Sequence, residues 1–291
     1  MPVKTGGSAH EGVKRCLEAY ISTGMRKTVG IFDSGLGGLT VVRAVRERLP
    51  GVDVVYLGDT ARVPYGNKSA RTVAKYAGTC AAFFAPHSVD LLLVACNTAT
   101  ALGINEVRAR TKAHVVGAVV PGAKRAVEVS KTGRVGVLST LATFNSGVYE
   151  TEIKRLDERA HVSAIPSPLL VPLAEEGWAE HPVSRQVAME YVRKLHGQDP
   201  GLDVIVLGCT HYPLLASTII DVAAECFGRE IAIVDSAVSM ASVAASVLGE
   251  GADGSDGQLR CFMTDDSRIS DLATRFLGEP LAHLELVDLV P

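Results

Sequence analysis

The sequence predicts an α/β protein of two domains, each built on a mostly parallel sheet. From residue 28 onward, short β-branched runs alternate with helix-length stretches, which is the pattern of strand–helix–strand units. Several of these runs are continuously apolar, as expected for strands buried on both faces of a parallel sheet. About nine candidate strands would be unusual in one open sheet, so we expect two sheets.

The candidate strands come in chain order at residues 29–32, 53–57, 90–95, 114–120, 134–138, 161–165, 203–207, 231–234 and 284–287. Each is a short run rich in apolar or β-branched residues. The stretches between them that are long enough for helices include residues 69–84, 97–112, 144–156, 183–195 and 236–248. The glycine-rich loop at 33–40 is expected to precede a further helix.

Two pairs of similar segments predict that the two halves of the chain are related by pseudo-symmetry. Residues 94–98 and 207–211 each place a cysteine directly after an apolar strand. Residues 29–34 and 135–140 are also alike, and each begins one half of the chain. We expect a first domain over 27–122 plus 230–291 and a second over 123–229, with the last segment returning to the first sheet. Residues 1–26 are interpreted as an extension, with a possible amphipathic helix at 11–20 and an alternative start at Met25.

Composition and charge exclude several classes of protein. The chain has 291 residues, 47% of them hydrophobic, which is enough apolar material for sizeable cores. A net charge of -3 leaves no basic surplus for a nucleic-acid backbone. No apolar run is long enough for a membrane span, and the first 26 residues lack the apolar core of a secretory signal. Six cysteines are too sparse for a disulfide scaffold, so we expect reduced thiols in the cytoplasm.

Polar residues follow several of the predicted strands, where parallel sheets bind their ligands. The first such group, at residues 33–40, is glycine-rich, but Thr40 stands where a dinucleotide loop needs its third glycine. Asp33 also precedes the loop, where it would repel a pyrophosphate, so a nucleotide site is not expected. The spacing alone leaves Asp33 equally interpretable as a helix cap or as a catalytic acid.

Cys96 and Cys209 are the most informative residues. Each follows a strand and precedes an expected helix, whose positive end should lower the thiol pKa, whereas Cys16, Cys80, Cys226 and Cys261 are interpreted as packing residues. Disulfide exchange prefers Cys-x-x-Cys, and zinc needs about four ligands; the sequence offers neither. Two-base proton transfer remains, because a racemase needs one acid–base group on each side of a carbon.

Other residues could support these thiols. His211, two positions after Cys209, could exchange a proton with it or orient it, although a lone histidine is more often structural. Glu175 and Glu176 follow an apolar segment and could support one thiol; taken alone they are interpreted as solvated acids at a helix start. The run at 63–69 is interpreted as a turn from its Pro and Gly content.

In these residues and the segments around them, the chain closely resembles the glutamate racemases of the cofactor-independent aspartate/glutamate racemase superfamily. The matching segments, in family order, are GIFDSGLGG (30–38), GDT (58–60) with PYG (64–66), ACNTA (95–99), GVLST (136–140), PLAEEG (172–177) and GCTHYP (208–213). Their joint occurrence over roughly residues 28–291 is far more specific than any single motif.

The resemblance implies two α/β domains with the active site in the cleft between them, and no pyridoxal phosphate, metal or nucleotide cofactor. It implies that Cys96 and Cys209 are the two proton donors and acceptors, that Asp33 assists Cys96, and that Glu175 and His211 assist Cys209. The implied substrate cradle is Ser34, Tyr65, Gly66, Asn97, Thr98, Thr140, Thr143, Thr210 and His211, with Asp33 also at the substrate. One departure is Ser167, where many members carry a cysteine; that position lies outside the acid–base pair.

The expected activity is the interconversion of L-glutamate and D-glutamate for peptidoglycan synthesis in the cytoplasm. A homodimer and an interaction with DNA gyrase are expected by family analogy alone. A racemase of aspartate or another acidic amino acid is the alternative within the superfamily. A binding or regulatory protein on the same scaffold is disfavoured because both cysteines are present. A pyridoxal-phosphate racemase would need a Schiff-base lysine, and no lysine lies at these strand ends.

Overall fold

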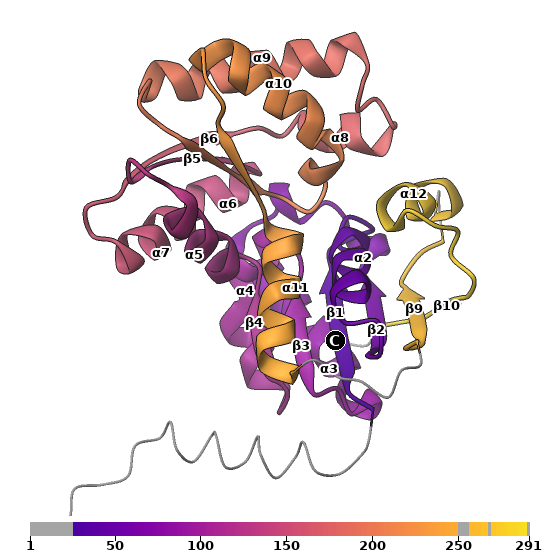
Figure 1. Ribbon diagram of the computed structural model, residues 1–291. Coiled ribbons are helices and arrows are strands. Elements are labelled where there is room, and N and C mark those ends of the chain that lie inside the picture. Colours follow the sequence, from indigo (N-terminus) through magenta and orange to yellow (C-terminus); the bar gives the residue numbers. More distant parts are fainter. Residues whose placement is uncertain (1–25, 250–255, 267–268, 290–291) are drawn as a thin grey trace, which may run out of the picture.

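The computed structural model describes residues 26–249, 256–266 and 269–289. Its strands form two separate, wholly parallel sheets, as the sequence predicts. Cys16, the N-terminal extension with its expected helix at 11–20, and the alternative start at Met25 lie outside the described residues. Figure 1 shows two lobes, one around each sheet.

The first sheet has six strands in the order β10-β9-β2-β1-β3-β4. These are β1 (Thr28–Asp33), β2 (Asp53–Gly58), β3 (Leu91–Val94), β4 (His114–Gly117), β9 (Leu259–Met263) and β10 (Leu284–Leu286). The helices of this lobe are α2 (Leu39–Arg48), α3 (Ala70–Phe83), α4 (Asn97–Arg110), α11 (Ser236–Leu248) and α12 (Ile269–Leu277). Apolar residues of α2, α11 and α12 cover one face of the sheet, and those of α3 and α4 cover the other.

The second sheet has four strands in the order β6-β5-β7-β8. These are β5 (Arg134–Ser139), β6 (His161–Pro166), β7 (Val204–Gly208) and β8 (Ala232–Asp235). Its helices are α5 (Val119–Val129), α6 (Leu141–Ser146), α7 (Val148–Leu156), α8 (Leu170–Glu175), α9 (Pro182–Gln198) and α10 (Ala216–Phe227). Apolar residues of α8, α9 and α10 pack on one face, and those of α5 and α7 on the other.

The expected pseudo-symmetry is visible in the strand order. The run β2-β1-β3-β4 of the first sheet has the same sequence of connections as β6-β5-β7-β8 of the second. Strands β3 and β7 therefore hold equivalent places, and each is followed by one of the two cysteines singled out above. The repetition explains why residues 94–98 and 207–211 look alike.

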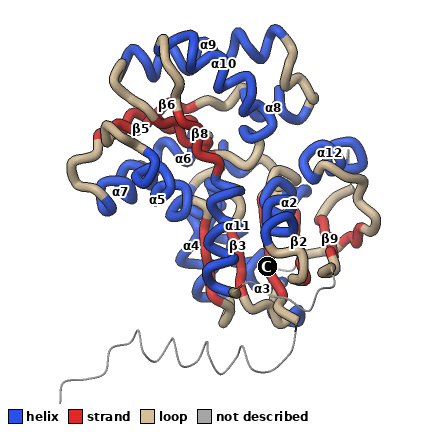
Figure 2. Tube along the Cα trace, in the orientation of Figure 1, coloured by secondary structure: helices blue, strands red, loops and turns tan. Residues whose placement is uncertain are grey.

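The chain passes between the lobes twice, and the passages differ slightly from those expected. The expected boundary after residue 122 falls inside α5, which packs on α7 and β7. The boundary expected at 230 precedes β8, which pairs with β7 and so belongs to the second sheet. The return follows Asp235, because α11 packs against α2 in the core of the first lobe; Figure 2 shows β8 running into α11.

Several expected elements have different bounds. The strand expected at 114–120 ends at Gly117, and Val119 begins α5 with Pro121 in its first turn, where a missing N–H costs little. The helix expected at 144–156 is two helices, because Gly147 adopts a left-handed φ of 64° between α6 and α7. Strand β9 was not expected; its short run contains Arg260 and pairs with β2.

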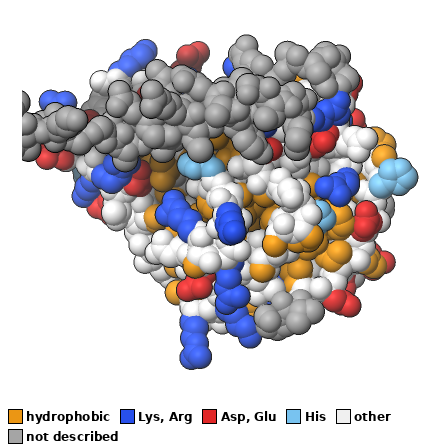
Figure 3. Space-filling view, turned by 90° about the horizontal axis from the view of Figure 1, so that it is seen from below, with side chains coloured by type: hydrophobic (Ala, Val, Ile, Leu, Met, Phe, Trp, Pro, Cys, Tyr) orange, Lys and Arg blue, Asp and Glu red, His pale blue; other side chains and the backbone are white. Residues whose placement is uncertain are grey.

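Figure 3 shows one face of the molecule, seen from below. Acidic, basic and hydrophobic side chains are all exposed on it. Over the ranges that the structure describes, no helix has the length and apolar character needed to cross a membrane.

The core of the second lobe offers a test of this packing. Leu207 of β7 is fully buried among apolar side chains of that lobe, so Leu207→Ala should lower the free energy of unfolding by about 2–5 kcal/mol. Urea denaturation followed by circular dichroism measures the change. The matched control is Leu169→Ala at a side chain that is 55% exposed, which should stay within about 0.5 kcal/mol. Equal losses in the two variants would contradict this packing.

Candidate active site

A cavity of about 310 Å³ lies between the lobes and is lined by residues that follow strands of both sheets. Ser34 and Cys96 follow β1 and β3 of the first sheet, and Thr140 and Cys209 follow β5 and β7 of the second. The full lining is Ser34, Pro64, Tyr65, Gly66, Asn67, Cys96, Asn97, Thr98, Thr140, Leu141, Pro168, Val171, Pro172, Cys209, Thr210 and His211. The carboxyl ends of both sheets therefore meet at one site, as ligand sites of parallel sheets do.

Most of the residues expected at the site from the sequence line this cavity. Asp33, Thr143 and Glu175 do not; each instead contacts or lies beside a residue that does. Thr143 is buried behind Thr98 and Thr140. The apolar lining residues, such as Leu141 and Val171, were not expected, because nothing in the sequence separates them from ordinary core residues.

Cys96 ends the run after β3 and caps the N-terminus of α4. Its Sγ accepts a hydrogen bond from Ala99 N at 3.4 Å and donates to Ser34 Oγ at 3.4 Å. Burial, followed by the negative charge of Asp33, raises the pKa of Cys96 to about 12. The backbone N–H of Ala99 in α4 lowers this pKa, as expected, but burial outweighs it, so the expected preference for the thiolate is wrong at Cys96. Cys96 is a thiol at neutral pH.

Asp33, at the end of β1, is fully buried beside Cys96. Its Oδ2 accepts a hydrogen bond from Gly35 N at 3.1 Å, and its Oδ1 has no partner among the described residues. The cap position of α2 is Gly38, without a side-chain bond, so Asp33 does not serve as that residue. Burial raises the pKa of Asp33, although the charge of His211 and nearby backbone N–H groups oppose the rise. A buried acid of this kind can hold or release a proton.

Cys209, from the second lobe, lies beside His211, which in turn contacts Glu175. His211 Nδ1 is 3.8 Å from Cys209 Sγ, and His211 Nε2 is 3.1 Å from Glu175 Oε1. Burial alone would lower the histidine pKa, but the hydrogen bonds with Cys209 and Glu175 and the negative charges nearby raise it to about 10. His211 is thus an imidazolium at neutral pH, and its Nδ1 places positive charge 3.8 Å from the sulfur of Cys209.

The segments around His211 differ in part from the expectation. Glu175, at the end of α8, contacts His211 and does not line the cavity. The expected helix does not begin directly after Cys209: a 3₁₀ turn over Tyr212–Leu215 comes first, and α10 starts at Ala216. The charge beside Cys209 is therefore supplied by His211.

Hydroxyl groups join the lobes along one wall of the cavity. Thr98 Oγ1 of α4 lies 2.9 Å from Thr140 Oγ1 and 3.1 Å from Thr143 Oγ1, both in the second lobe. Thr40 Oγ1 donates to the carbonyl of Thr210 at 3.3 Å. Because hydroxyls both donate and accept, Thr98 and Thr140, which line the cavity, can offer either role to a bound molecule.

Tyr149 of α7 crosses the lobe boundary and fixes Asn97. Its hydroxyl donates to Asn97 Oδ1 at 2.6 Å, while Asn97 Nδ2 has no partner among the described residues. Tyr149 is not predictable from the sequence, because no motif surrounds it and it lies far from Asn97 in the chain. The contact leaves a buried amide N–H₂ of a cavity-lining residue available to an acceptor.

Tyr65 is held from behind by the buried carboxylate of Asp59. The tyrosine hydroxyl donates to Asp59, whose carboxylate also accepts from Arg62 Nε at 2.8 Å and from Thr264 Oγ1 at 3.1 Å. Asp59 stands in one of the matching segments, but no role was predicted for it. These contacts fix the turn that presents Tyr65 and Gly66 to the cavity.

The other three cysteines among the described residues do not line the cavity. Burial raises the pKa of Cys80 and of Cys261, and both lie in core clusters of the first lobe. Cys226 is half-buried, with its sulfur 3.2 Å from the sulfur of Met189. These three thiols fit the packing role expected of them.

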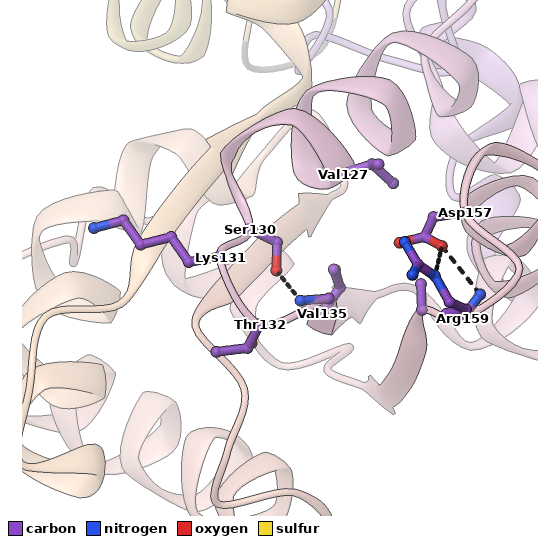
Figure 4. Close-up of a pocket in the computed structure, with 9 residues that line it drawn as sticks. Val127, Ser130, Lys131, Thr132, Val135, Asp157 and Arg159 are labelled. Carbon is purple, nitrogen blue, oxygen red and sulfur yellow. Dashed lines mark hydrogen bonds and ion pairs between the residues drawn. The ribbon is translucent and has the colours of Figure 1, made fainter.

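A second cavity, of about 360 Å³, lies at the opposite end of the second sheet, where β5 and β6 begin. Figure 4 shows Ser130 bonded within its own turn and Asp157 joined to Arg159, while Lys131 points away from both. Ser130 Oγ accepts from Gly133 N at 2.9 Å, and the Arg159 guanidinium lies 3.6 Å from Asp157. Neither cysteine nor histidine is among its lining residues, so the acid–base chemistry gathers in the interlobe cavity.

The residues that the structure describes contain no group of three or more His, Cys, Asp or Glu side chains arranged to hold a metal ion. The polar groups that line the interlobe cavity are hydroxyls, amides, two thiols and one imidazole. Such groups can bind carboxylates and exchange protons.

Comparison with known proteins places this site in a family. Residues 39–244 match the family described as Asp/Glu/Hydantoin racemase. The glutamate racemase of Geobacter metallireducens is 41% identical over 268 residues, which cover 90% of this chain and 97% of that protein. The glutamate racemase of Syntrophus aciditrophicus is 42% identical over 266 residues, 90% of this chain and 96% of that protein.

A solved structure agrees with these sequences. The crystal structure of glutamate racemase from Francisella tularensis in complex with D-glutamate superimposes with a TM-score of 0.82 at 32% identity, covering 91% of this chain and 98% of that one. The expected fold and resemblance are thereby confirmed. The chain belongs to the Asp/Glu/Hydantoin racemase family, and within it to the glutamate racemases.

Proposed function

We propose that this chain interconverts L-glutamate and D-glutamate by proton transfer between two thiols and so supplies D-glutamate for peptidoglycan. One observation carries the proposal: Cys96 and Cys209 follow equivalent strands of two similar sheets and line the same cavity. A racemase must remove a proton from one side of a carbon and return one to the other, and thiols offered by two facing lobes suit that task.

The two thiols have different neighbours. Burial and Asp33 favour the neutral thiol at Cys96, whereas Cys209 lies 3.8 Å from the cationic imidazole of His211. In the proposed mechanism one sulfur accepts a proton and the other donates one. That pairing is the starting condition for a single turnover.

In that turnover, the Cys209 thiolate takes the α-proton and becomes a thiol, and the C–H bonding pair stays on the α-carbon. The Cys96 thiol then gives its proton to the opposite face of the carbanion and becomes a thiolate. The reverse direction exchanges these roles. Asp33 can return a proton to Cys96, and His211 can mediate the return of the proton from Cys209, which restores the starting state.

The cavity lining suits an acidic amino acid. The α-carboxylate and side-chain carboxylate would be bound by neutral donors, among them the hydroxyls of Ser34 and Thr98 and the amide of Asn97. The N-terminus of α4 begins at Asn97 and adds partial positive charge. Both substrate and product are small anions with the same two carboxylates, so one cradle can bind both.

The cellular setting follows from the same proposal. The five described cysteines are unpaired, as thiol catalysis in a reducing cytoplasm requires. A homodimer remains an expectation from the family, and the DNA gyrase interaction is an expectation of the same kind.

Substituting either thiol should abolish racemisation. We expect Cys96→Ser and Cys209→Ser each to lower kcat by on the order of 10²–10⁴-fold, because a hydroxyl is a far weaker acid–base group at this pH. Circular dichroism with either enantiomer measures the rate. Cys226→Ser, outside the cavity, is the matched control and should retain activity. Full activity in either site variant would exclude the two-thiol mechanism.

The charge of His211 predicts a pH-dependent contribution to stability. Its pKa rises from 6.5 to about 10 on folding, so its protonation stabilises the fold fully below pH 6.5 and progressively less as pH rises toward 10. Urea midpoints of the unsubstituted protein and His211→Asn should therefore differ more at pH 7 than at pH 10.5. A difference that grows with pH would show that the imidazole is not held as a cation.

The substrate range can be tested directly. We expect L-glutamate to racemise faster than L-aspartate under identical conditions, because the relatives named above are glutamate racemases. Parallel circular dichroism assays with both amino acids give the ratio of kcat/KM values. A ratio in favour of aspartate would support the alternative within the superfamily.

A further inference from the structure

We propose that Phe276 and Arg275, on α12 of the first lobe, are positioning residues that hold the acid–base group beside Cys209 in the second lobe. Neither residue lines the cavity, so both would act through His211 and Glu175. The inference rests on the proposed two-thiol racemisation and adds to it the residues that orient one of its two sides.

Phe276 packs against the imidazole of His211. The two rings meet edge to face, with centroids 5.0 Å apart and planes at 76°, and the phenyl ring is fully buried. The phenyl ring offers no conventional hydrogen-bond acceptor to the imidazolium. Its role is steric, because a rigid aromatic ring restricts how the imidazole can rotate. His211 Nδ1 must stay directed toward Cys209 for proton exchange.

A second part of the first lobe confines His211 as well. A Cβ atom at Gly37, just before α2, would lie 2.6 Å from His211 Nδ1 and 2.4 Å from Thr210 Oγ1. Only a glycine allows the backbone this close. The imidazole therefore lies against two elements of the first lobe, the start of α2 and the end of α12.

Arg275 acts on the other member of the pair. Its Nη1 donates to the backbone carbonyl of Glu175, the residue whose carboxylate contacts His211. Its guanidinium also covers Gly177, where a Cβ atom would lie 2.6 Å from Arg275 Cζ. The backbone that carries Glu175 is thus tied to α12.

The helix is itself anchored in the first lobe. Leu272, Ala273 and Leu277 belong to the core cluster that includes α2 and the first sheet, and Figure 1 shows α12 beside α2. Because α12 belongs to the first lobe, its contacts can fix His211 and Glu175 of the second lobe only while the two lobes are in contact. The orientation of the second acid–base group is therefore set from across the lobe boundary.

The test is the deuterium isotope effect on kcat/KM, measured with α-deuterated L-glutamate and D-glutamate. The equilibrium between enantiomers is symmetric, so a variant must lose kcat/KM equally in both directions. Isotope effects need not change equally. When proton transfer at Cys209 becomes slower, the isotope effect rises for the enantiomer from which Cys209 removes deuterium and falls for the other.

We expect Phe276→Leu to lower kcat/KM by about tenfold, the scale of a modest misplacement of a catalytic group, and to shift the two isotope effects in opposite directions. Phe84→Leu is the matched control: it removes a ring that is also buried in the first lobe but lies in a different core cluster from Phe276. That control should leave both isotope effects unchanged.

Arg275→Ala tests the same proposal at an exposed side chain, where loss of folding is not expected. It should shift the isotope effects in the same sense and by less. Arg229→Ala is its control, since Arg229 is also exposed and also donates to backbone carbonyls, those of Pro200 and Leu202.

Opposite shifts in the α12 variants, absent from both controls, support the proposal. A fall in kcat/KM with unchanged isotope effects would mean that α12 is merely structural, and unchanged kinetics would likewise overturn the proposal. Failure of the underlying function is a distinct result: the unsubstituted protein would not racemise glutamate, or Cys209→Ser would remain active.

Discussion

The rest of the molecule depends on one constraint: the carboxyl ends of strands from two different sheets must face each other across one cavity. Parallel strands direct all their carboxyl ends to one edge of a sheet, and here the edges of two sheets face one cavity. The repeated strand order places Cys96 and Cys209 at equivalent positions, so that two similar lobes offer two thiols to one site. A single sheet could present several side chains at its edge, but all of them would approach a ligand from the same side.

The two half-sites share a topology and differ in charge. Cys96 is buried next to an acid whose own pKa burial raises, whereas Cys209 lies beside an imidazolium that Glu175 supports. The symmetry of the backbone therefore does not extend to the electrostatics. The difference follows from the neighbours that each local segment brings: a buried strand end at Asp33 beside Cys96, and a turn carrying His211 beside Cys209.

Sequence patterns predicted both sheets, the repeated halves and the residues that follow the strands, because those features depend on local hydrophobic runs and on short motifs. They did not predict β9, whose pairing with β2 joins segments about two hundred residues apart, or the break at Gly147, which one left-handed residue causes. The pKa of Cys96 was expected to fall and rises instead, since burial depends on the whole lobe. Tyr149 and Phe276 reach the site only through tertiary contacts, which no motif records.

The hydrogen bond between Tyr149 and Asn97 has a consequence for recognition. A free carboxamide can present its oxygen or its nitrogen by turning over, and so it accepts ligands of either polarity. With its oxygen engaged by the phenol, the Asn97 amide has only its donor end left to offer. A neutral side chain then discriminates by the sign of charge, favouring a carboxylate over an ammonium group at that position without the desolvation cost of a buried cation.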